Sequence, residues 1–185
     1  MHLKTIKLRG FKSFVDPVEV RLEPGVAVVV GPNGSGKSNI SDSILWATGS
    51  LSPHELRAEK PDDVLFAGSN GRTAVDFCEV ELIFDNEDGA WPDLPFSEVS
   101  LSRRLHRGGE GQYLVNRTPV RRIDLIELLS DVGLGGGEPV SDIFRRDLAG
   151  AAIWIRCRLF AGGGARATYF VYVHALWIGD PAQAP

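Results

Sequence analysis

The chain has 185 residues, with 20 lysine or arginine and 24 aspartate or glutamate residues, which give a formal net charge of −4. Hydrophobic residues make up 43% and charged residues 24%, a composition typical of a soluble globular protein that excludes disorder, collagen and a disulfide scaffold. Nucleic-acid binding would therefore need a local basic patch. Two cysteines and an N-terminus without a signal-peptide core lead us to expect a cytoplasmic protein with no membrane span.

The first 50 residues predict strands, a loop and a helix. Residues 3–8 and 18–22 are typical of short strands, and the continuous apolar run at residues 26–30 predicts a strand buried on both faces. A glycine-rich loop follows, and then a helix over about residues 37–48. The buried stripe of this helix would consist of Ile40, Ile44, Leu45 and Ala47.

The middle of the chain predicts an antiparallel group of strands. Apolar residues alternate with glutamate over residues 78–84 and with serine over 99–102, and residues 113–115 form a third short strand. Glycine-rich residues 108–111 would connect the last two strands as a hairpin. A helix follows over about residues 122–132, so the chain is expected to have an α/β fold with an antiparallel subdomain. One face of this helix would carry Leu125, Ile126, Leu129 and Val132.

Residues 31–38, Gly-Pro-Asn-Gly-Ser-Gly-Lys-Ser, match the phosphate-binding pattern G-x-x-x-x-G-K-[ST]. Glycines let backbone N–H groups turn toward an anion, and the N-terminus of the following helix favours negative charge. Lys37 would supply positive charge to the outer phosphates, and the Ser38 hydroxyl would be a ligand of Mg²⁺. The alternative is a glycine-rich strand-to-helix turn that binds nothing.

A phosphate loop does not fix the reaction, because catalysis needs a second acid at the end of a buried strand. Asp85 is the obvious candidate, but Glu79 and Glu81 give its strand a solvated face, whereas such a strand should be apolar on both faces. Residues 85–89 are then better interpreted as a solvated turn. On this interpretation the catalytic acid is absent from the chain.

Further motifs accompany the phosphate loop in a fixed order. They are residues 10–14, 31–39, 56–57, 63–69, 79–82, 84–86, 99–104, 113–116, 127–131 and 133–135. Over about residues 1–137 the chain thus closely resembles the N-terminal head half of bacterial SMC chromosome-partition ATPases. The resemblance implies the N-lobe of an ABC-type P-loop NTPase, with a mixed sheet, an antiparallel β subdomain and flanking helices.

The resemblance also implies an ATP-binding half-site that uses Mg²⁺. Its nucleotide-binding residues would be Lys12, Ser13, Pro32, Asn33, Gly34, Ser35, Gly36, Lys37, Ser38 and Asn39. Arg57 stands at the position of a family arginine that reaches the phosphates, where a guanidinium could stabilise charge on the transferring phosphoryl group. The ordinary alternatives are a surface arginine in a loop with Glu55 and Glu59, and a solvated turn lysine at position 12.

Family partners would be double-stranded DNA, a second SMC head in a homodimer, and kleisin-type subunits. The local cations are Lys60, Arg72, Arg103, Arg104, Arg107, Arg117, Arg121 and Arg122. Lys60, Arg121 and Arg122 are our candidates for DNA contacts, although an ordinary solvated face is the alternative for each. Arg103 and Arg104 are adjacent in a strand, so they should point to opposite faces and cannot share one patch.

The resemblance ends near residue 137. Residues 138–185 contain no lysine and no chemical motif, although residues 153–159 and 169–173 could form strands. The Q-loop glutamine of the family is missing, because Gln183 lies in the tail. Also missing are the heptads of the coiled coil and the C-terminal lobe with its signature motif and Walker B acid. We interpret residues 138–185 as a replaced or frameshifted tail, with a genuine fused segment as the alternative.

Four functions follow from these observations. The first is the ATP-binding half-site of an SMC-type ATPase in chromosome condensation and segregation, which alone hydrolyses almost nothing. The second is a RecF- or RecN-like DNA-repair ATPase, although residues 10–14 and 63–69 favour SMC. The third is a self-contained small P-loop NTPase that uses Asp85, and the fourth is a binding module with a vestigial loop.

Overall fold

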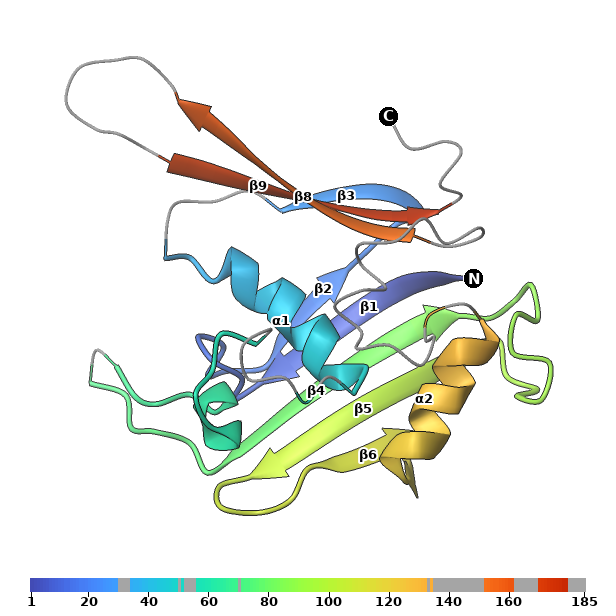
Figure 1. The fold of residues 1–185 in the computed structure, drawn as a ribbon, viewed down its shortest axis with the longest axis horizontal. Helices are drawn as coiled ribbons and strands as arrows, with labels where there is room; N and C mark the ends of the chain where they lie inside the picture. Colours follow the sequence, from blue (N-terminus) through green and yellow to red (C-terminus); the bar gives the residue numbers. More distant parts are fainter. Residues whose placement is uncertain are drawn as a thin grey trace.

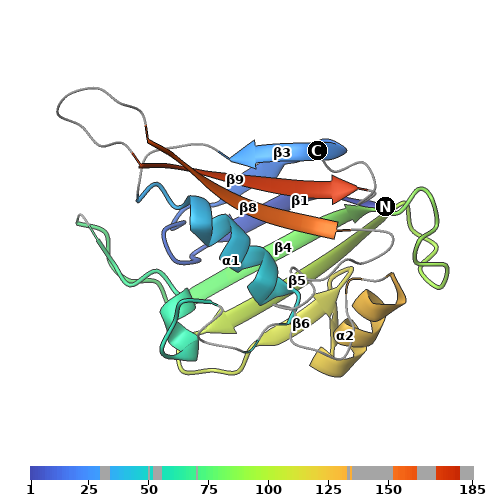
Figure 2. The ribbon, with the colours of Figure 1, turned by 45° about the horizontal axis from the view of Figure 1, so that its top comes forward.

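The structure is a computed structural model that describes residues 1–29, 34–49, 51, 56–69, 71–132, 134, 152–161 and 170–179. Its elements, in chain order, are β1 (His2–Arg9), β2 (Val18–Arg21), β3 (Gly25–Val29), α1 (Lys37–Ala47), the 3₁₀ helix η1 (Pro61–Val64), β4 (Phe77–Asp85), β5 (Glu98–His106), β6 (Gln112–Val115), β7 (Thr118–Val120), α2 (Arg122–Asp131), β8 (Ala152–Ala161) and β9 (Phe170–Gly179). The strands form a six-stranded sheet, β2-β1-β4-β5-β6-β7, and a three-stranded sheet, β3-β9-β8 (Figure 1). Helix α1 lies between the two sheets (Figure 2).

The six-stranded sheet has one apolar face, and both helices pack on it. Leu82 of β4 pairs with Ile6 of β1 on one side and with Leu101 of β5 on the other, and all three side chains are fully buried. Burial of such a side chain stabilises the folded state by about 1.5–3 kcal/mol. This face therefore forms the main core of the described chain. The alternation predicted for residues 78–84 is therefore confirmed.

The opposite face of this sheet is polar. Lys7 and Glu81 form a cross-strand ion pair at 3.3 Å, and Arg104 and Glu79 form another at 2.6 Å. Because β4 lies between two antiparallel neighbours and has this solvated face, its surroundings differ from those expected of a strand that carries a catalytic acid. Asp85 at its end accepts a hydrogen bond from the Glu87 backbone N–H at 3.1 Å, as a turn residue would.

The strand before the phosphate loop differs from its prediction. β3 pairs only with β9 among the described strands, and Ala27 and Val29, which share one face of the strand, are half-buried. Every pairing in the described part of the chain is antiparallel, so the parallel component expected of a mixed sheet is not seen there. The physical reason is that burial of a strand depends on its neighbours in space, which periodicity along the chain does not specify.

Helix α1 is buried over a wider surface than the predicted stripe. Ile44 and Ala47 are buried and Ile40 and Leu45 are half-buried, as the pattern indicated. In addition, Trp46, Asp42 and Ser43 are buried, because α1 is covered by elements on more than one side. The burial of Asp42 is central to the site described below.

Adjacent arginines on β5 point to opposite faces, as predicted. The Arg103 guanidinium lies 4.6 Å from the Trp46 ring and 4.8 Å from the Tyr113 ring, and it donates to the Trp46 carbonyl at 2.8 Å. Arg104 pairs with Glu79 on the polar face. Arg103 is thus a core cation that joins α1 to the sheet, and it is not part of a DNA-binding surface.

Helix α2 and the β5–β6 hairpin also match their predictions. Leu125 and Leu129 of α2 are buried, and Ile126 and Val132 are half-buried beside them. The Trp91 indole donates to the Leu128 carbonyl at 2.7 Å and ties α2 to the loop after β4. No helix within the described ranges is long and apolar enough to cross a membrane.

The tail elements β8 and β9 are described by their backbone. They pair with each other along their whole length, and β9 pairs with β3 between Gly25 and Val29. The strands that the sequence allowed at residues 153–159 and 169–173 are therefore present in the structure.

Candidate nucleotide-binding site

The second half of the phosphate loop leads directly into α1. Gly34 and Gly36 have φ angles of 81° and 89°, in the left-handed region that glycine adopts at little cost. Gly36 is the N-cap of α1, and the first turn of the helix contains no acidic residue. The backbone N–H groups of this turn therefore present positive potential to the loop. Gly31, Pro32 and Asn33 lie outside the described residues.

The two polar residues that follow the last loop glycine occupy the first turn of α1. Lys37 is buried and Ser38 is half-buried, so both side chains are held within the structure rather than extended into solvent. Ser35 and Gly34 are exposed. The roles expected for the loop, in which backbone N–H groups and Lys37 meet an anion, stay a prediction.

A turn from the first strand region packs against the loop. A methyl group placed on Gly36 would lie 2.6 Å from the Ser13 hydroxyl oxygen, so a side chain at this position would require that hydroxyl to move. The same hydroxyl accepts a hydrogen bond from the Asn39 side-chain amide at 2.9 Å. The structure thus brings Ser13 and Asn39, both proposed from the sequence, to the edge of the phosphate loop.

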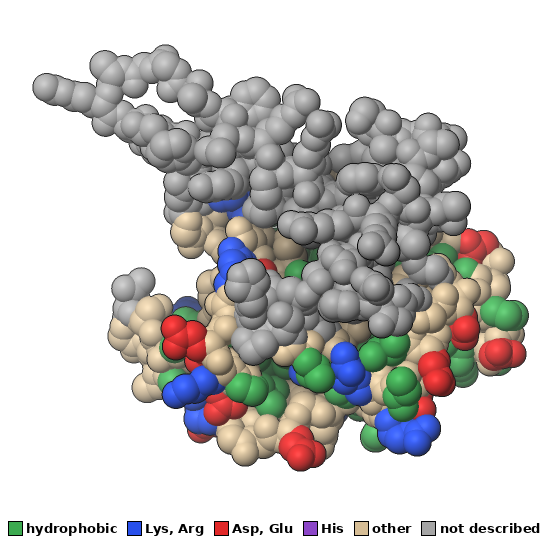
Figure 3. All heavy atoms as spheres, in the orientation of Figure 1, with side chains coloured by type: hydrophobic (Ala, Val, Ile, Leu, Met, Phe, Trp, Pro, Cys, Tyr) green, Lys and Arg blue, Asp and Glu red, His purple; other side chains and the backbone are tan. Residues whose placement is uncertain are grey.

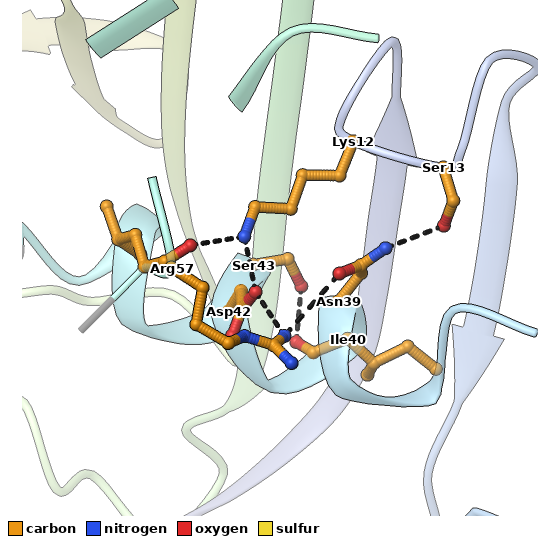
Figure 4. A network of polar contacts seen from close by, with 8 residues as sticks. Lys12, Ser13, Asn39, Ile40, Asp42, Ser43 and Arg57 are labelled. Carbon is orange, nitrogen blue, oxygen red and sulfur yellow. Dashed lines mark hydrogen bonds and ion pairs between the residues drawn. The ribbon is translucent and has the colours of Figure 1, made fainter. Parts of the chain in front are cut away.

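A buried carboxylate joins the two cations that the sequence singled out (Figure 4). Lys12 Nζ and Arg57 Nη2 each lie 2.5 Å from the same oxygen, Oδ2 of Asp42. Lys12 Nζ also donates to the Leu56 carbonyl. The exposed fraction of the side chain is 6% for Asp42, 11% for Lys12 and 52% for Arg57, so Arg57 alone reaches well into solvent.

Helix periodicity connects this carboxylate with the loop. Asn39 and Asp42 are three residues apart, so they lie on the same face of α1. The Asn39 side-chain oxygen accepts a long hydrogen bond from Arg57 at 3.5 Å, while its amide donates to Ser13. We call Lys12, Ser13, Asn39, Asp42 and Arg57 the Asp42 cluster. Its members come from three chain segments and meet beside the phosphate loop.

Both cations of the cluster have unusual backbone conformations. Lys12 has a φ of 47° and Arg57 a φ of 49°, in the region that residues other than glycine rarely adopt. Such a conformation costs about 1–3 kcal/mol and persists only where surrounding contacts enforce it. The Lys12 backbone N–H donates to the Val64 carbonyl at 2.7 Å, and both side chains are anchored on Asp42.

The cluster shows the surroundings of two residues whose roles stay predictions. Lys12 is not a solvated turn lysine, because most of its side chain is buried against Asp42. Arg57 is exposed, but its ionic partner is Asp42 on α1; Glu55 lies outside the described residues. Lys12, Asp42 and Arg57 together carry a formal charge of +1, which suits an anion at this place.

The three candidate DNA contacts lie at two places in the fold: Arg121 and Arg122 are adjacent at the start of α2, and Lys60 precedes η1. Arg121 binds the Asp124 carboxylate at 2.6 Å and 3.0 Å, and Arg122 donates to the Gly49 carbonyl at 2.9 Å. Lys60 lines a groove of about 290 Å³ beside Trp46 and Leu56. Figure 3 shows acidic and basic side chains interspersed on the visible described surface. This view therefore gives no direct support to a single basic patch.

Asp42 is the site residue that the sequence interpretation missed. The signal was available, because Lys37 and Asp42 are the only charged residues in α1. A single carboxylate in an otherwise uncharged, largely buried stretch of helix requires a partner. That partner could not be identified from local spacing, since Lys12 lies 30 residues away and Arg57 lies 15 residues away.

The phosphate loop, the helix that follows it and the antiparallel subdomain define the N-terminal lobe of a P-loop NTPase head. A family model described as the RecF/RecN/SMC N terminal domain matches residues 2–138, and the chain belongs to this family. Residues 2–138 correspond to the N-terminal SMC head region of this family, as the sequence motifs predicted. The α/β head fold is likewise confirmed.

Two relatives and two solved structures illustrate the similarity. The chain is 50% identical over 133 residues to the chromosome partition protein Smc of Desulfitobacterium hafniense (strain Y51), covering 72% of this chain and 11% of the relative. It is 47% identical over 135 residues to that of Bacillus subtilis (strain 168), covering 73% of this chain and 11% of the relative. The chain therefore spans about a tenth of the length of these relatives.

The first structure comes from work on ATP-driven dimerization and DNA-stimulated activation of SMC ATPases. It has a TM-score of 0.70 and 32% identity, and covers 74% of this chain and 82% of the other. The second is the Pyrococcus furiosus Smc head domain with an extended coiled coil, bound to the C-terminal domain of ScpA. It has a TM-score of 0.68 and 35% identity, and covers 71% of this chain and 33% of the other.

Proposed function

We propose that this chain is the ATP-binding half-site of an SMC-type ATPase that acts in chromosome condensation and segregation. The observation that carries the proposal is the junction of the loop glycine Gly36, the buried Lys37 and the start of α1, beside the Asp42 cluster. Family membership in the SMC ATPases supports the nucleotide class. ATP is therefore the ligand that we assign to the loop.

The residues present fit a nucleotide with Mg²⁺. Gly36 has a φ of 89° at the start of α1, a conformation that lets backbone N–H groups turn toward a phosphate. Lys37 would neutralise phosphate charge, and Ser38 is the residue that would hold Mg²⁺. When bound, Mg²⁺ would supply positive charge at the outer phosphates. The other proposed nucleotide contacts are Lys12, Ser13, Pro32, Asn33, Gly34, Ser35 and Asn39, with Arg57 as a phosphate-contacting arginine.

We propose that hydrolysis depends on polypeptide outside residues 1–137. The candidate acid Asp85 lies at the end of an antiparallel strand, where it accepts a turn hydrogen bond and pairs across the sheet with His2 and Glu98. That position offers no reason to assign it to the phosphate loop. A Walker B acid from the C-terminal lobe and a signature motif from a second head would complete the site by family resemblance.

The assignment of partners rests on the relatives. A solved SMC head binds ScpA, and another comes from work on ATP-driven dimerization and DNA-stimulated activation, so we propose a second head, a kleisin-type subunit and double-stranded DNA as partners of the whole protein. Lys60, Arg121 and Arg122 remain proposed DNA contacts. We also propose a cytoplasmic location and a replaced tail over residues 138–185.

A turnover assay tests the half-site against a self-contained NTPase. Hydrolysis of Mg-ATP is measured for the 185-residue chain and for its Lys37→Ala and Asp85→Asn variants. We expect all three to release almost no phosphate, because the chain lacks the other half of the site. Robust turnover that is lost in Asp85→Asn, but kept in the exposed control Asp93→Asn, would overturn the half-site in favour of a small P-loop NTPase.

A further inference from the structure

Asp42 is the one buried acidic side chain in the described part of the chain, and the proposed phosphate chemistry gives it no task. Burial of a carboxylate is costly unless the charge is paired. Asp42 is paired twice through a single oxygen, since Lys12 Nζ and Arg57 Nη2 both lie 2.5 Å from Oδ2. Such sharing fixes the relative positions of the two cations.

The contacts around Asp42 form a closed ring. Lys12 donates to the carbonyl of Leu56, the residue that precedes Arg57, so the turn at Lys12 and the turn at Arg57 are joined to each other as well as to α1. Both cations have left-handed backbones, which these contacts hold in place. Without the carboxylate, two positive charges would face each other with no anion between them.

Arg57 uses one nitrogen, Nη2, for its contacts with both Asp42 and Asn39. About half of its side chain is exposed, and Asn39 and then Ser13 connect it with Gly36 at the end of the phosphate loop (Figure 4). A guanidinium has five N–H donors in a planar fork, so one edge can bind a carboxylate while the other binds a phosphate.

We propose that Asp42 is a positioning residue, whose Oδ2 atom holds Lys12 and Arg57 beside the phosphate loop so that Arg57 meets the phosphates of bound ATP. This inference rests on the proposed ATP-binding function. Asp42 itself does not contact the nucleotide, and it acts through Arg57. Its effect on affinity should therefore require Arg57, whereas a carboxylate that only stabilises the fold would act whether or not Arg57 is present.

A double-mutant cycle on nucleotide affinity tests the proposal. The Kd of a fluorescent ATP analogue with Mg²⁺ is measured for the 185-residue chain and for Asp42→Asn, Arg57→Ala and the double variant. We expect each single variant to bind about tenfold more weakly, and the double variant to bind no more weakly than Arg57→Ala. An unchanged Kd in Asp42→Asn, or a loss of about a hundredfold in the double variant, would overturn it.

Lysine acetylation without nucleotide provides a second measurement. The Lys12 side chain is 11% exposed and that of Lys4 is 47% exposed, so limited acetylation followed by mass spectrometry should modify Lys12 slowly in the wild-type chain. Asp42→Asn should accelerate modification of Lys12 several-fold and leave Lys4 unchanged. No acceleration, or equal acceleration at both lysines through general unfolding, would count against a positioning role.

The failure of the inference and that of the ATP-binding function give different results. If Lys37→Ala binds the analogue as tightly as the wild-type chain, the loop is not the nucleotide site, and both proposals are overturned. If binding requires Lys37 but the losses from Asp42→Asn and Arg57→Ala add, the ATP-binding function is supported and only the role of Asp42 is overturned. The exposed variant Asp93→Asn is the matched control for loss of one negative charge.

Discussion

Gly36 and Ser13 lie so close together that a methyl group on Gly36 would be 2.6 Å from the Ser13 hydroxyl oxygen. The contact joins the end of the phosphate loop to the segment between β1 and β2, in which Ser13 lies. It also places Ser13 beside Asn39, the first α1 residue of the Asp42 cluster. A side chain at position 36 would displace the Ser13 hydroxyl from its hydrogen bond with Asn39, and it would also have to adopt a φ of 89°.

Substitution of Gly36 should therefore be more damaging than substitution of Gly34. Both glycines have positive φ angles, but a methyl group added to Gly36 would meet neighbouring atoms within 4 Å, whereas one added to Gly34 would meet none. We expect Gly34→Ala to cost about 1–2 kcal/mol through backbone strain alone. Gly36→Ala should cost about 1 kcal/mol more and weaken ATP binding further. Urea unfolding of both variants gives the comparison, and equal losses would contradict the importance of the Ser13 contact.

Removal of the Arg103 side chain should destabilise the fold. The guanidinium stacks on Trp46 and Tyr113 and donates to the Trp46 carbonyl in a buried setting. Arg103→Ala should lower the free energy of unfolding by about 2–4 kcal/mol, since stacking, packing and a hydrogen bond are all lost. The neighbouring Arg104→Ala, which breaks a half-exposed ion pair, should cost about 1 kcal/mol or less. Equal decreases in the denaturant midpoint for Arg103→Ala and Arg104→Ala would contradict this prediction.

The thiol of Cys78 should react only after unfolding. Burial raises the pKa of Cys78 to about 12, so the reactive thiolate is scarce at neutral pH and is also inaccessible. We expect iodoacetamide to modify Cys78 very slowly at pH 8, and quickly once guanidinium chloride is added. Peptide mass spectrometry separates Cys78 from Cys157. Rapid modification of Cys78 in the native chain would contradict its burial and show that reagent reaches the core around β4.

Asp63 should contribute stability that disappears in acid. Its carboxylate accepts hydrogen bonds from the backbone N–H groups of Lys60 and Glu59, both at 2.8 Å, which lowers the pKa of Asp63 below its ordinary value. A lowered folded-state pKa gives stability that is present above the unfolded pKa of about 3.9 and is lost as the pH falls through the folded value.

The pH dependence of thermal unfolding measures this contribution. Asp63→Asn should have a lower Tm than the wild-type chain at pH 6, and the difference should shrink below about pH 4, where the wild-type carboxylate becomes protonated. Asp93→Asn, at an exposed position, is the control and should show little difference at either pH. A Tm difference that stays constant from pH 6 to pH 2 would exclude the proposed hydrogen bonds as its cause.

Local patterns predicted much of the fold. The alternation in β4, the opposite faces of Arg103 and Arg104, and the positions of α1 and α2 all follow from periodicities of two or 3.6 residues. The phosphate loop was identified because its glycines and Lys37 are contiguous. These features depend on residues close together in the chain, and they are the ones that sequence interpretation is able to predict.

Non-local features were missed or predicted wrongly. The apolar run of β3 predicted burial on both faces, but Ala27 and Val29 are half-buried, and only the packing of other elements on that face determines their burial. Asp42 was overlooked because its partners Lys12 and Arg57 come from separate turns. In both cases the controlling contact joins residues far apart in the chain, which periodicity does not report.

Equilibrium titration of Mg-ATP into the 185-residue chain and into Lys37→Ala tests the central claim most directly. We expect saturable binding to the wild-type chain and a Kd at least about tenfold weaker for Lys37→Ala, because the ammonium group supplies a charge-assisted contact to the phosphates. Lys7→Ala, on the polar face of the sheet, should bind like the wild type. Identical binding by the wild type and Lys37→Ala, or no binding by either, would contradict an ATP site at this loop.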